Sequence, residues 1–337
     1  MFFAQNLGEH PAALRIGPLS LSGRVLLAPM AGVTDAGLRR AAHRRGAALT
    51  FSEMVASTGL LEGDGECVAR AAPAEGGLRA TQLVGREPAA MAEAARRLEA
   101  EGAELIDINM GCPARRVAGA LAGSALMRDL GAAARILEAV ASAVKVPVSV
   151  KTRLGWDDAN RNAVALAAKA QAVGVKMVTV HGRTRCQFYQ GAADWRAVAE
   201  VVAAVEIPVV VNGDCRSLQD ARAMLAASGA SAVMIGRAAI GAPWIIGAFA
   251  RALERGGPVV APAPEDRRDD ALGHLEYLLT SMGARTGLRH ARKHLSAYVA
   301  NEAAPEPLRR ALVTTEAPSE AFDLLARAFD SGLEQAA

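Results

Sequence analysis

The sequence is poor in the residues that would place it in several common classes of protein. Aromatic residues make up only 4% of its 337 positions, and four cysteines are scattered without a Cys-x-x-Cys pair. This scatter shows no disulfide framework and no cysteine-based zinc motif, so we expect no metal. No uncharged apolar run approaches membrane-spanning length, and no basic segment with an apolar core opens the chain. We therefore expect no membrane association and a cytoplasmic, reduced protein.

Charge is also nearly balanced. The sequence has 38 basic and 35 acidic residues, and its net charge is +3. Such a balance permits an anionic partner without demanding one. Hydrophobic residues make up 51%, with frequent alanine and glycine, which indicates a folded chain with closely packed helices. The length exceeds one average domain and suits an α/β barrel with a small added domain.

Short β-branched runs alternate with alanine-rich stretches of helical spacing. Strands separated by helices pair in parallel, and roughly eight such units fit a closed barrel better than an open sheet. We predict a TIM (β/α)8 barrel over residues 1–255. Its expected strands are 25–28, 49–52, 79–83, 105–108, 148–150, 177–180, 209–211 and 232–235.

The pattern changes after about residue 255. Glycines and a proline at 256–258, followed by alternating Ala-Pro at 261–264, indicate a linker. We predict that residues 256–337 form this linker and a small all-helical C-terminal domain. Its expected helices are 266–281, 287–301, 307–314 and 319–335.

Several predicted strands end at equivalent positions in polar residues or glycine. Three segments share one layout, in which a glycine ends a helix and a short connection leads into a strand. Two further segments place a proline just before the strand. Shared capping explains the glycines and prolines, but it does not explain polar side chains at the exits. These exit residues are Asn109, Lys151, His181, Asn212 and Gly236, and in a barrel they converge on the rim that holds the active site.

One strand exit carries a thiol. The segment Ile-Asp-Ile-Asn-Met-Gly-Cys-Pro is an apolar run that ends in a polar residue, a glycine turn and Cys112. In a chain without a cysteine-rich pattern, a thiol at this place indicates a reagent rather than a structural link. Cys186 also follows a strand exit and is the rival candidate.

The last two strands end in glycine turns of a kind that holds phosphate in barrels. Asn212-Gly213-Asp214 follows one strand and Gly236-Arg237 follows the next. Backbone N–H groups of such turns, together with the N-terminus of a short helix, bind phosphate at this corner. The adjacent turns favour a phosphate-bearing cofactor.

Three further features favour FMN as that cofactor. An unpaired ammonium of Lys151 would be costly in a barrel mouth, and an anionic reduced flavin would compensate it. Gln82 stands where it could bond the edge of a flavin ring, and the turn from Pro29 to Gly32 offers little side-chain bulk near a flat ring. No Gly-x-Gly-x-x-Gly follows a strand, which disfavours a resident nicotinamide.

Taken together, the motifs resemble the tRNA-dihydrouridine synthases, and most closely their bacterial B-type branch. They span roughly residues 15 to 255, with a weaker echo at 292–294 and an N-terminal extension before Ile16 that the sequence leaves without expected structure. The motifs are Ala-Pro-Met-Ala-Gly-Val-Thr-Asp from Ala28, Ser-Glu-Met from Ser52, Asp-Ile-Asn-Met-Gly-Cys-Pro from Asp107, Lys-Thr-Arg-Leu-Gly-Trp from Lys151, His-Gly-Arg-Thr-Arg from His181, Asn-Gly-Asp from Asn212 and Met-Ile-Gly-Arg-Ala from Met234.

The resemblance implies FMN in a barrel, NADPH as the reductant and a uridine of tRNA as the substrate. Hydride would pass from flavin N5 to uracil C6, and Cys112 would supply a proton to C5 from the opposite face. The same family setting favours Cys112 over Cys186. By motif, FMN contacts fall on Pro29, Met30, Ala31, Gln82, Lys151, His181, Asn212, Gly213, Asp214, Gly236 and Arg237, and substrate contacts on Asn109, Arg153, Arg183 and Arg185.

A uridine within folded RNA must be flipped out to meet a buried flavin, at a cost of a few kcal/mol. Phosphate contacts would offset that cost. Candidates are Arg115, Arg116, Arg183, Thr184, Arg185, Arg289, His290, Arg292, Lys293 and His294.

Two alternatives to a tRNA-modifying enzyme stay open: an FMN barrel that reduces a free pyrimidine or another small enone, and a non-catalytic RNA-binding regulator. We expect a monomer. His43 and His274 are expected on helix surfaces and Cys67 in a loop. Trp156 is expected to pack in the fold, and its place near the rim leaves base stacking open.

Overall fold

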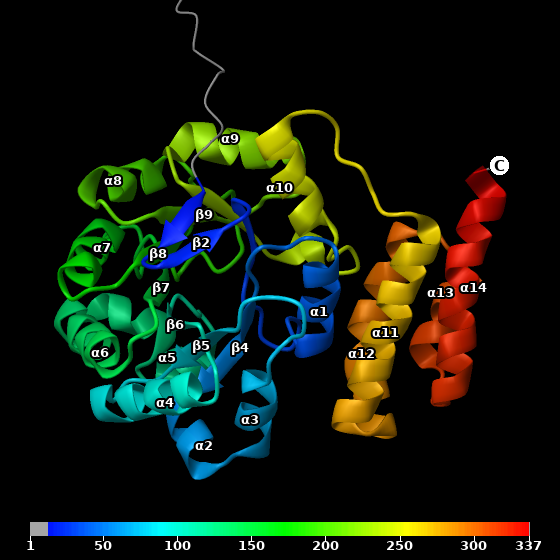
Figure 1. Ribbon diagram of the computed structural model, residues 1–337, viewed down its shortest axis with the longest axis horizontal. Coiled ribbons are helices and arrows are strands. Elements are labelled where there is room, and N and C mark those ends of the chain that lie inside the picture. Colours follow the sequence, from blue (N-terminus) through cyan, green and yellow to red (C-terminus); the bar gives the residue numbers. More distant parts are fainter. Residues whose placement is uncertain (1–12, 337) are drawn as a thin grey trace, which may run out of the picture.

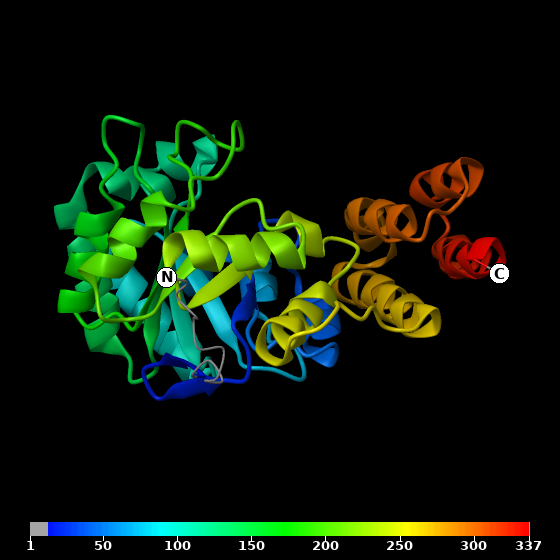
Figure 2. The ribbon, with the colours of Figure 1, turned by 90° about the horizontal axis from the view of Figure 1, so that it is seen from above.

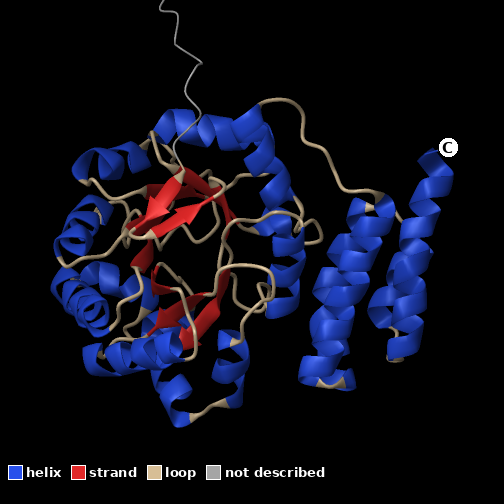
Figure 3. Cartoon of the chain, viewed as in Figure 1, coloured by secondary structure: helices blue, strands red, loops and turns tan. Residues whose placement is uncertain are grey.

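The computed structural model describes residues 13–336, and its centre is an eight-stranded parallel sheet curled into a barrel (Figures 1 and 3). Neighbouring strands follow the order β3-β10-β9-β8-β7-β6-β5-β4. A parallel bridge between Leu27 and Thr50 joins the two ends of this order and closes the ring. The strands are β3 (Val25–Leu27), β4 (Phe51–Ala56), β5 (Ala80–Val84), β6 (Leu105–Met110), β7 (Val148–Arg153), β8 (Met177–His181), β9 (Val209–Asn212) and β10 (Ala232–Ile235). The predicted barrel is confirmed.

Helices surround the sheet on its outer side (Figure 3). Their ends carry the expected signals: Ser217 and Asp220 form a capping box at the start of α9, and Gly229 ends that helix at a φ of 66°. The outer helices are α1 (Ala36–Arg44), α4 (Pro88–Ala100), α6 (Leu130–Ala143), α7 (Ala163–Ala172), α8 (Ala197–Ala204), α9 (Leu218–Ser228) and α10 (Ile245–Arg255). Shorter helical turns are α2 (Ser57–Glu62), α3 (Gly65–Ala71), α5 (Arg115–Gly119), η1 (Gly123–Arg128) and η2 (Arg237–Ala239).

Alternation along each strand sorts side chains between the barrel interior and the helices. In β6, Ile106 and Ile108 pack in the core between sheet and helices, whereas Leu105 belongs to the separate core inside the barrel. The period of two therefore turns Asp107 and Asn109 inward above Leu105. Among the interior side chains, apolar ones such as Leu105 and Met177 form a core, and polar ones such as Asn109 and Lys151 line the cavity at the C-terminal rim.

A two-stranded hairpin covers the floor of the barrel. β1 (Leu14–Ile16) pairs antiparallel with β2 (Leu19–Leu21), and both pack on interior residues such as Phe51 and Met177. The expectation that the segment before Ile16 lacks structure is wrong for Leu14 and Arg15, which belong to β1. The strand forms because its apolar side chains shield the barrel interior from water. Residues 1–12, which that expectation also included, lie outside the described part of the chain.

Some strands continue further toward the rim than their apolar runs suggested. β6 continues to Met110 and β7 to Arg153, and β4 lies later than expected, at Phe51–Ala56. Apolar content marks only the part of a strand that packs in a hydrophobic core, whereas the backbone ladder continues through buried polar residues. Lys151 therefore pairs with Asn109 within the sheet instead of following it.

Four helices form the C-terminal region, which stands beside the barrel (Figures 1 and 2). They are α11 (Pro264–Met282), α12 (Ala284–Asn301), α13 (Glu306–Thr314) and α14 (Pro318–Ala336). Their own apolar core includes Leu275, Leu295, Leu312 and Phe329. The expected all-helical C-terminal region is confirmed. No helix among residues 13–336 is long and apolar enough to cross a membrane.

Three expectations about single residues are corrected by the packing. His43 is buried and contacts the Ala47 carbonyl and the Thr50 hydroxyl, at 3.0 and 2.9 Å. His274 is buried because α11 packs against α1 through the face that carries it. Cys67 lies buried in α3, where its N–H donates to Asp64, rather than in a loop.

Candidate functional site

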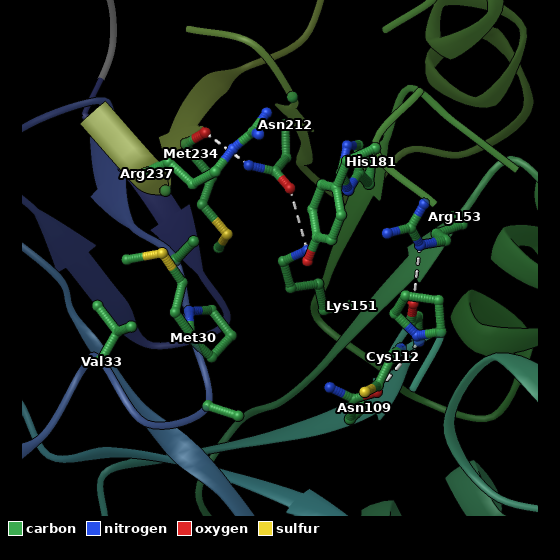
Figure 4. Close-up of a pocket in the computed structure, with 18 of the residues that line it drawn as sticks. Met30, Val33, Asn109, Cys112, Lys151, Arg153, His181, Asn212, Met234 and Arg237 are labelled. Carbon is green, nitrogen blue, oxygen red and sulfur yellow. Dashed lines mark hydrogen bonds between the residues drawn. The ribbon is translucent and has the colours of Figure 1, made fainter. Parts of the chain in front are cut away.

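The polar strand exits converge on one cavity of about 720 Å³ at the C-terminal rim of the barrel (Figure 4). Met30 stands on one side of this cavity and Cys112 on the other, with Lys151 between them in the view of Figure 4. Of the site residues expected from sequence, all except Arg183 and Arg185 line it. Those lining it are Pro29, Met30, Ala31, Gln82, Asn109, Cys112, Lys151, Arg153, His181, Asn212, Gly213, Asp214, Gly236 and Arg237.

Lys151 brings a positive charge into this cavity from β7. Its Nζ donates to Asn212 Oδ1 at 3.1 Å, and Asn212 Nδ2 donates to the Met234 carbonyl at 2.8 Å (Figure 4). Burial, together with the neighbouring Arg153, lowers the pKa of Lys151 to about 8. The ammonium therefore lacks full compensation from the protein and suits an anionic ligand.

Asp107 begins a chain of hydrogen bonds that leads to the thiol loop. Its Oδ1 accepts from the Ser149 hydroxyl and its Oδ2 from Gln82 Nε2, both at 2.6 Å. Gln82 Oε1 accepts from Asn109 Nδ2 at 2.8 Å, and Asn109 Oδ1 accepts from the Cys112 N–H at 2.9 Å. Burial raises the pKa of Asp107 to about 6. The network fixes both amides, and through them the backbone that carries Cys112.

Arg153 also holds the thiol loop. Its Nε donates to the Gly111 carbonyl at 2.9 Å, and its Nη1 donates to the carbonyls of Thr184 and Phe188 at 3.0 and 2.9 Å. A Cβ at position 111 would lie 3.2 Å from the Thr152 carbonyl carbon, so glycine lets the loop lie close to β7. Burial lowers the pKa of Arg153 to about 10, which still leaves it charged at neutral pH.

Arg183 lies between His181 and Asp214 and contacts both side chains. The Arg183 guanidinium is buried, donates to Asp214 and to the Gly191 carbonyl, and lies 3.3 Å from His181 Nε2. Asp214 also pairs with Arg237 at 3.2 Å. Burial, reinforced by nearby cations, holds the pKa of His181 well below its usual range, so its ring is neutral. Arg183 contacts the protein here and not the cavity.

Arg185 and Cys186 lie on the outer side of the same loop. The Arg185 guanidinium stacks on the rings of Trp156 and Phe188, 4.6 and 4.8 Å from their centroids. Cys186 is exposed and does not line the cavity, whereas Cys112 does.

Sequence reasoning missed two groups at this site. The role of Asp107 was missed because the residue was treated only as part of the motif that carries Cys112. Its spacing of two from Asn109 nevertheless indicated that both side chains lie on the same face of the strand. Tyr189 lines the cavity with its ring under the guanidinium groups of Arg153 and Arg237, at 5.7 and 5.1 Å. The sequence alone does not indicate that an exposed tyrosine in a loop will line the cavity.

The basic residues expected to contact phosphate divide into exposed and buried ones. Arg289 and Lys293 are exposed on α12, and Arg115 is exposed on α5, whereas the side chain of Arg116 is outside the described part. Arg292 donates to the Thr315 carbonyl at 3.4 Å. His294 is buried against Asp35, so its expected phosphate contact is wrong.

Comparisons of the chain with known proteins indicate one family. The sequence model described as "Dihydrouridine synthase (Dus)" matches residues 26–333. The "Probable tRNA-dihydrouridine synthase" of Rhodobacter capsulatus is 49% identical over 318 residues, which are 94% of this chain and 98% of the relative. The "tRNA-dihydrouridine synthase B" of Xanthomonas axonopodis pv. citri is 46% identical over 94% of this chain and 96% of the relative.

Solved structures share the fold at much lower identity. Histamine dehydrogenase from Rhizobium sp. 4-9 has a TM-score of 0.54 and 15% identity, over 81% of this chain and 50% of that one. A variant of NCR from Zymomonas mobilis has a TM-score of 0.51 and 19% identity, over 77% of this chain and 94% of that one. These similarities extend to the barrel architecture.

Proposed function

The chain belongs to the dihydrouridine synthase family, and from that premise we propose that it reduces one specific uridine of tRNA to 5,6-dihydrouridine with FMN and NADPH. The observation that carries this proposal is the cavity at the barrel rim, where Cys112 stands across from the Met30 turn and Lys151 lies between them. A tRNA substrate would place the enzyme in the cytoplasm.

The residues around the cavity fit FMN. Lys151, Arg153 and Arg237 bring positive charge to its lining, against the single carboxylate of Asp214. Such an excess suits a phosphate and an electron-rich ring. The glycine at 213 adopts a φ of 119°, and a Cβ there would lie 2.8 Å from that of Ala193, so only glycine leaves this turn open. We assign the remaining ring contacts to Pro29, Met30, Ala31, Gln82, His181, Asn212 and Gly236.

FMN reduced by NADPH would supply hydride to uracil C6, and the protein would supply the proton and hold the substrate. Cys112 would donate a proton to C5 from the opposite face. Asn109 has one amide hydrogen left after bonding Gln82, and we assign it to the uracil edge. Arg153 holds the thiol loop in place, and Arg183 orients His181 and Asp214 without touching substrate.

The tRNA would lie across the barrel rim and the C-terminal region. We propose residues 256–337 as a linker and tRNA-binding domain beside a catalytic domain of 1–255. Arg185 lies on the rim, and Arg289 and Lys293 are exposed on α12. Their charges would bind phosphates and offset the cost of extruding the target uridine.

The decisive experiment maps dihydrouridine in tRNA from cells that lack this protein. We expect the modification to be lost at one position and restored by the wild-type chain but not by Cys112→Ala. Retention of dihydrouridine at every position would contradict the proposal. A yellow purified protein that reduces only a free pyrimidine would instead favour a small-molecule reductase, and one without flavin would favour a non-catalytic RNA-binding protein.

A further inference from the structure

A second group of buried titratable residues lies where the barrel meets the C-terminal helices. We call Asp35, His274, His290 and His294 the junction cluster. Asp35 is the N-cap of α1, and His290 and His294 lie one turn apart on one face of α12. Asp35, His290 and His294 each present a ligand atom, and these atoms all lie within 4.8 Å of one another.

The histidines of α12 have buried nitrogens without partners. His294 is 1% exposed, and within residues 13–336 neither of its ring nitrogens has a hydrogen bond. The Nε2 of His290 is also buried and unpaired in that part of the chain. Buried polar atoms are nearly always satisfied, and leaving one unsatisfied costs about 1–3 kcal/mol. Three such atoms beside one carboxylate indicate a missing ligand.

The separation of His294 from Asp35 suits a shared metal ion better than a direct hydrogen bond. His294 Nε2 lies 3.6 Å from Asp35 Oδ2, which is too long for a good hydrogen bond. Two ligands at about 2.0–2.1 Å from one tetrahedral zinc ion are separated by roughly 3.3 Å. Two histidines spaced by four on a helix are also a common half of a zinc site.

The surroundings of Asp35 are already arranged as they are around metal-bound carboxylates. His274 Nε2 donates to both carboxylate oxygens, at 3.0 and 3.1 Å, and its Nδ1 accepts from the Tyr298 hydroxyl at 3.1 Å. Hydrogen bonds of this kind orient metal ligands in known sites. Burial would raise the pKa of Asp35, but His274 outweighs that effect, so the carboxyl is ionised.

The protonation states are also those a metal requires. Burial, then the neighbouring His274, lowers the pKa of His294 to about 2, and burial and Lys293 lower that of His290. Both rings are neutral at physiological pH, as metal-bound imidazoles are. Lys293 opposes a cation, since its Nζ lies 3.5 Å from His290 Nδ1, but its exposed side chain has room to turn to solvent.

We propose that Asp35, His290 and His294 bind one divalent transition-metal ion of the zinc type. Two imidazoles and one carboxylate favour such an ion over Mg²⁺ or Ca²⁺. The fourth position would be left for water. Because Asp35 directly follows the turn that lines the cavity at Met30, the ion would fasten this turn to α12. The site is separate from the proposed chemistry at Cys112.

The test uses untagged, FMN-bound protein. The protein is stripped with a chelator, dialysed against Zn²⁺ and analysed for metal, and its affinity for Zn²⁺ is measured by calorimetry. We expect one zinc per chain. His290→Gln and His294→Gln should each weaken binding more than tenfold, and His274→Gln should weaken it roughly 10–100-fold by loosening Asp35.

Lys293→Met is the matched control, because it removes a nearby positive charge from the same helix and should bind zinc at least as tightly as wild type. If His294→Gln does not fold, His290→Gln, at a less buried position, decides the question. Absence of stoichiometric zinc, or zinc binding of equal strength in His290→Gln and wild type, would overturn the proposal. Dihydrouridine formation is measured in parallel, so loss of zinc without loss of activity separates the two proposals.

Discussion

The barrel mouth and the junction cluster are both buried groups of titratable side chains, but they differ in how their polar atoms are paired. At the mouth, Gln82 and Asn109 bond through both ends of their amides. At the junction, neither nitrogen of His294 has a partner in the described chain. A closed network holds its shape before any ligand arrives, which is what preorganised catalysis needs. An open one indicates that a component is missing.

The largest effect is expected at the mouth, from Cys112→Ala. The substitution removes the proposed proton donor but leaves the backbone bonds of the loop. Dihydrouridine formation in a single turnover should slow by about 10²–10⁴-fold. FMN content and the rate of flavin reduction by NADPH should stay unchanged, as stopped-flow absorbance would show. A variant with normal turnover on tRNA would remove Cys112 from the mechanism.

His274→Leu tests the paired part of the junction. Without its ring, the Asp35 carboxylate loses its principal donor, and the free energy of unfolding should fall by about 1.5–3 kcal/mol. Urea unfolding with a chelator present measures this term without metal. Tyr298→Phe, which removes only the outer hydrogen bond, should cost about 1 kcal/mol. If His274→Leu kept its stability but slowed flavin reduction, the junction cluster would act on the chemistry at the barrel mouth, and the two regions would not differ in role.

Asp107→Asn breaks the mouth network at its origin. An amide there must turn an N–H group toward the Ser149 hydroxyl or toward Gln82 Nε2, and about 1–3 kcal/mol of stability should be lost. The wild type should also lose stability as pH rises from 3.8 to about 6, since the folded carboxyl holds its proton longer than the unfolded one. The variant should lack this slope in urea unfolding.

Lys151→Met tests the uncompensated charge in flavin-free protein. The pKa of Lys151 is lowered from 10.5 to about 8, so between these values the unfolded chain binds more protons than the folded one. Stability of the wild type should therefore rise by about 1 kcal/mol from pH 7 to pH 9. The same measurement on Lys151→Met should show no such rise. An equal rise in both proteins would assign it to another group.

The smallest effect is expected from Cys186→Ser. This thiol is exposed on the outer side of its loop, so turnover on tRNA should stay within about twofold of wild type. A loss comparable to that of Cys112→Ala would show that the roles of Cys112 and Cys186 had been assigned wrongly.

Several features of this molecule could be read from the sequence because they depend on local patterns. Eight apolar runs separated by helical spacing predicted the barrel, and equal offsets predicted that Asn109, Lys151 and Asn212 share a rim. Strand ends were predicted less well, because polar residues such as Lys151 continue the backbone ladder after the apolar signal stops. Burial of His43 and His274 depends on which helix faces meet, and a single helix does not encode that.

The sequence by itself determined the order of strands and helices, and with it the edge of the barrel where its polar residues gather, because side-chain periodicity and parallel pairing are local rules. Only the tertiary structure decided which polar groups satisfy one another. Asp107 reaches Gln82 across neighbouring strands, and Asp35 meets histidines some 240 or more positions away only because α1 packs beside α11 and α12. Hydrogen bonds and metal coordination depend on distance in space, which the chain acquires when it folds.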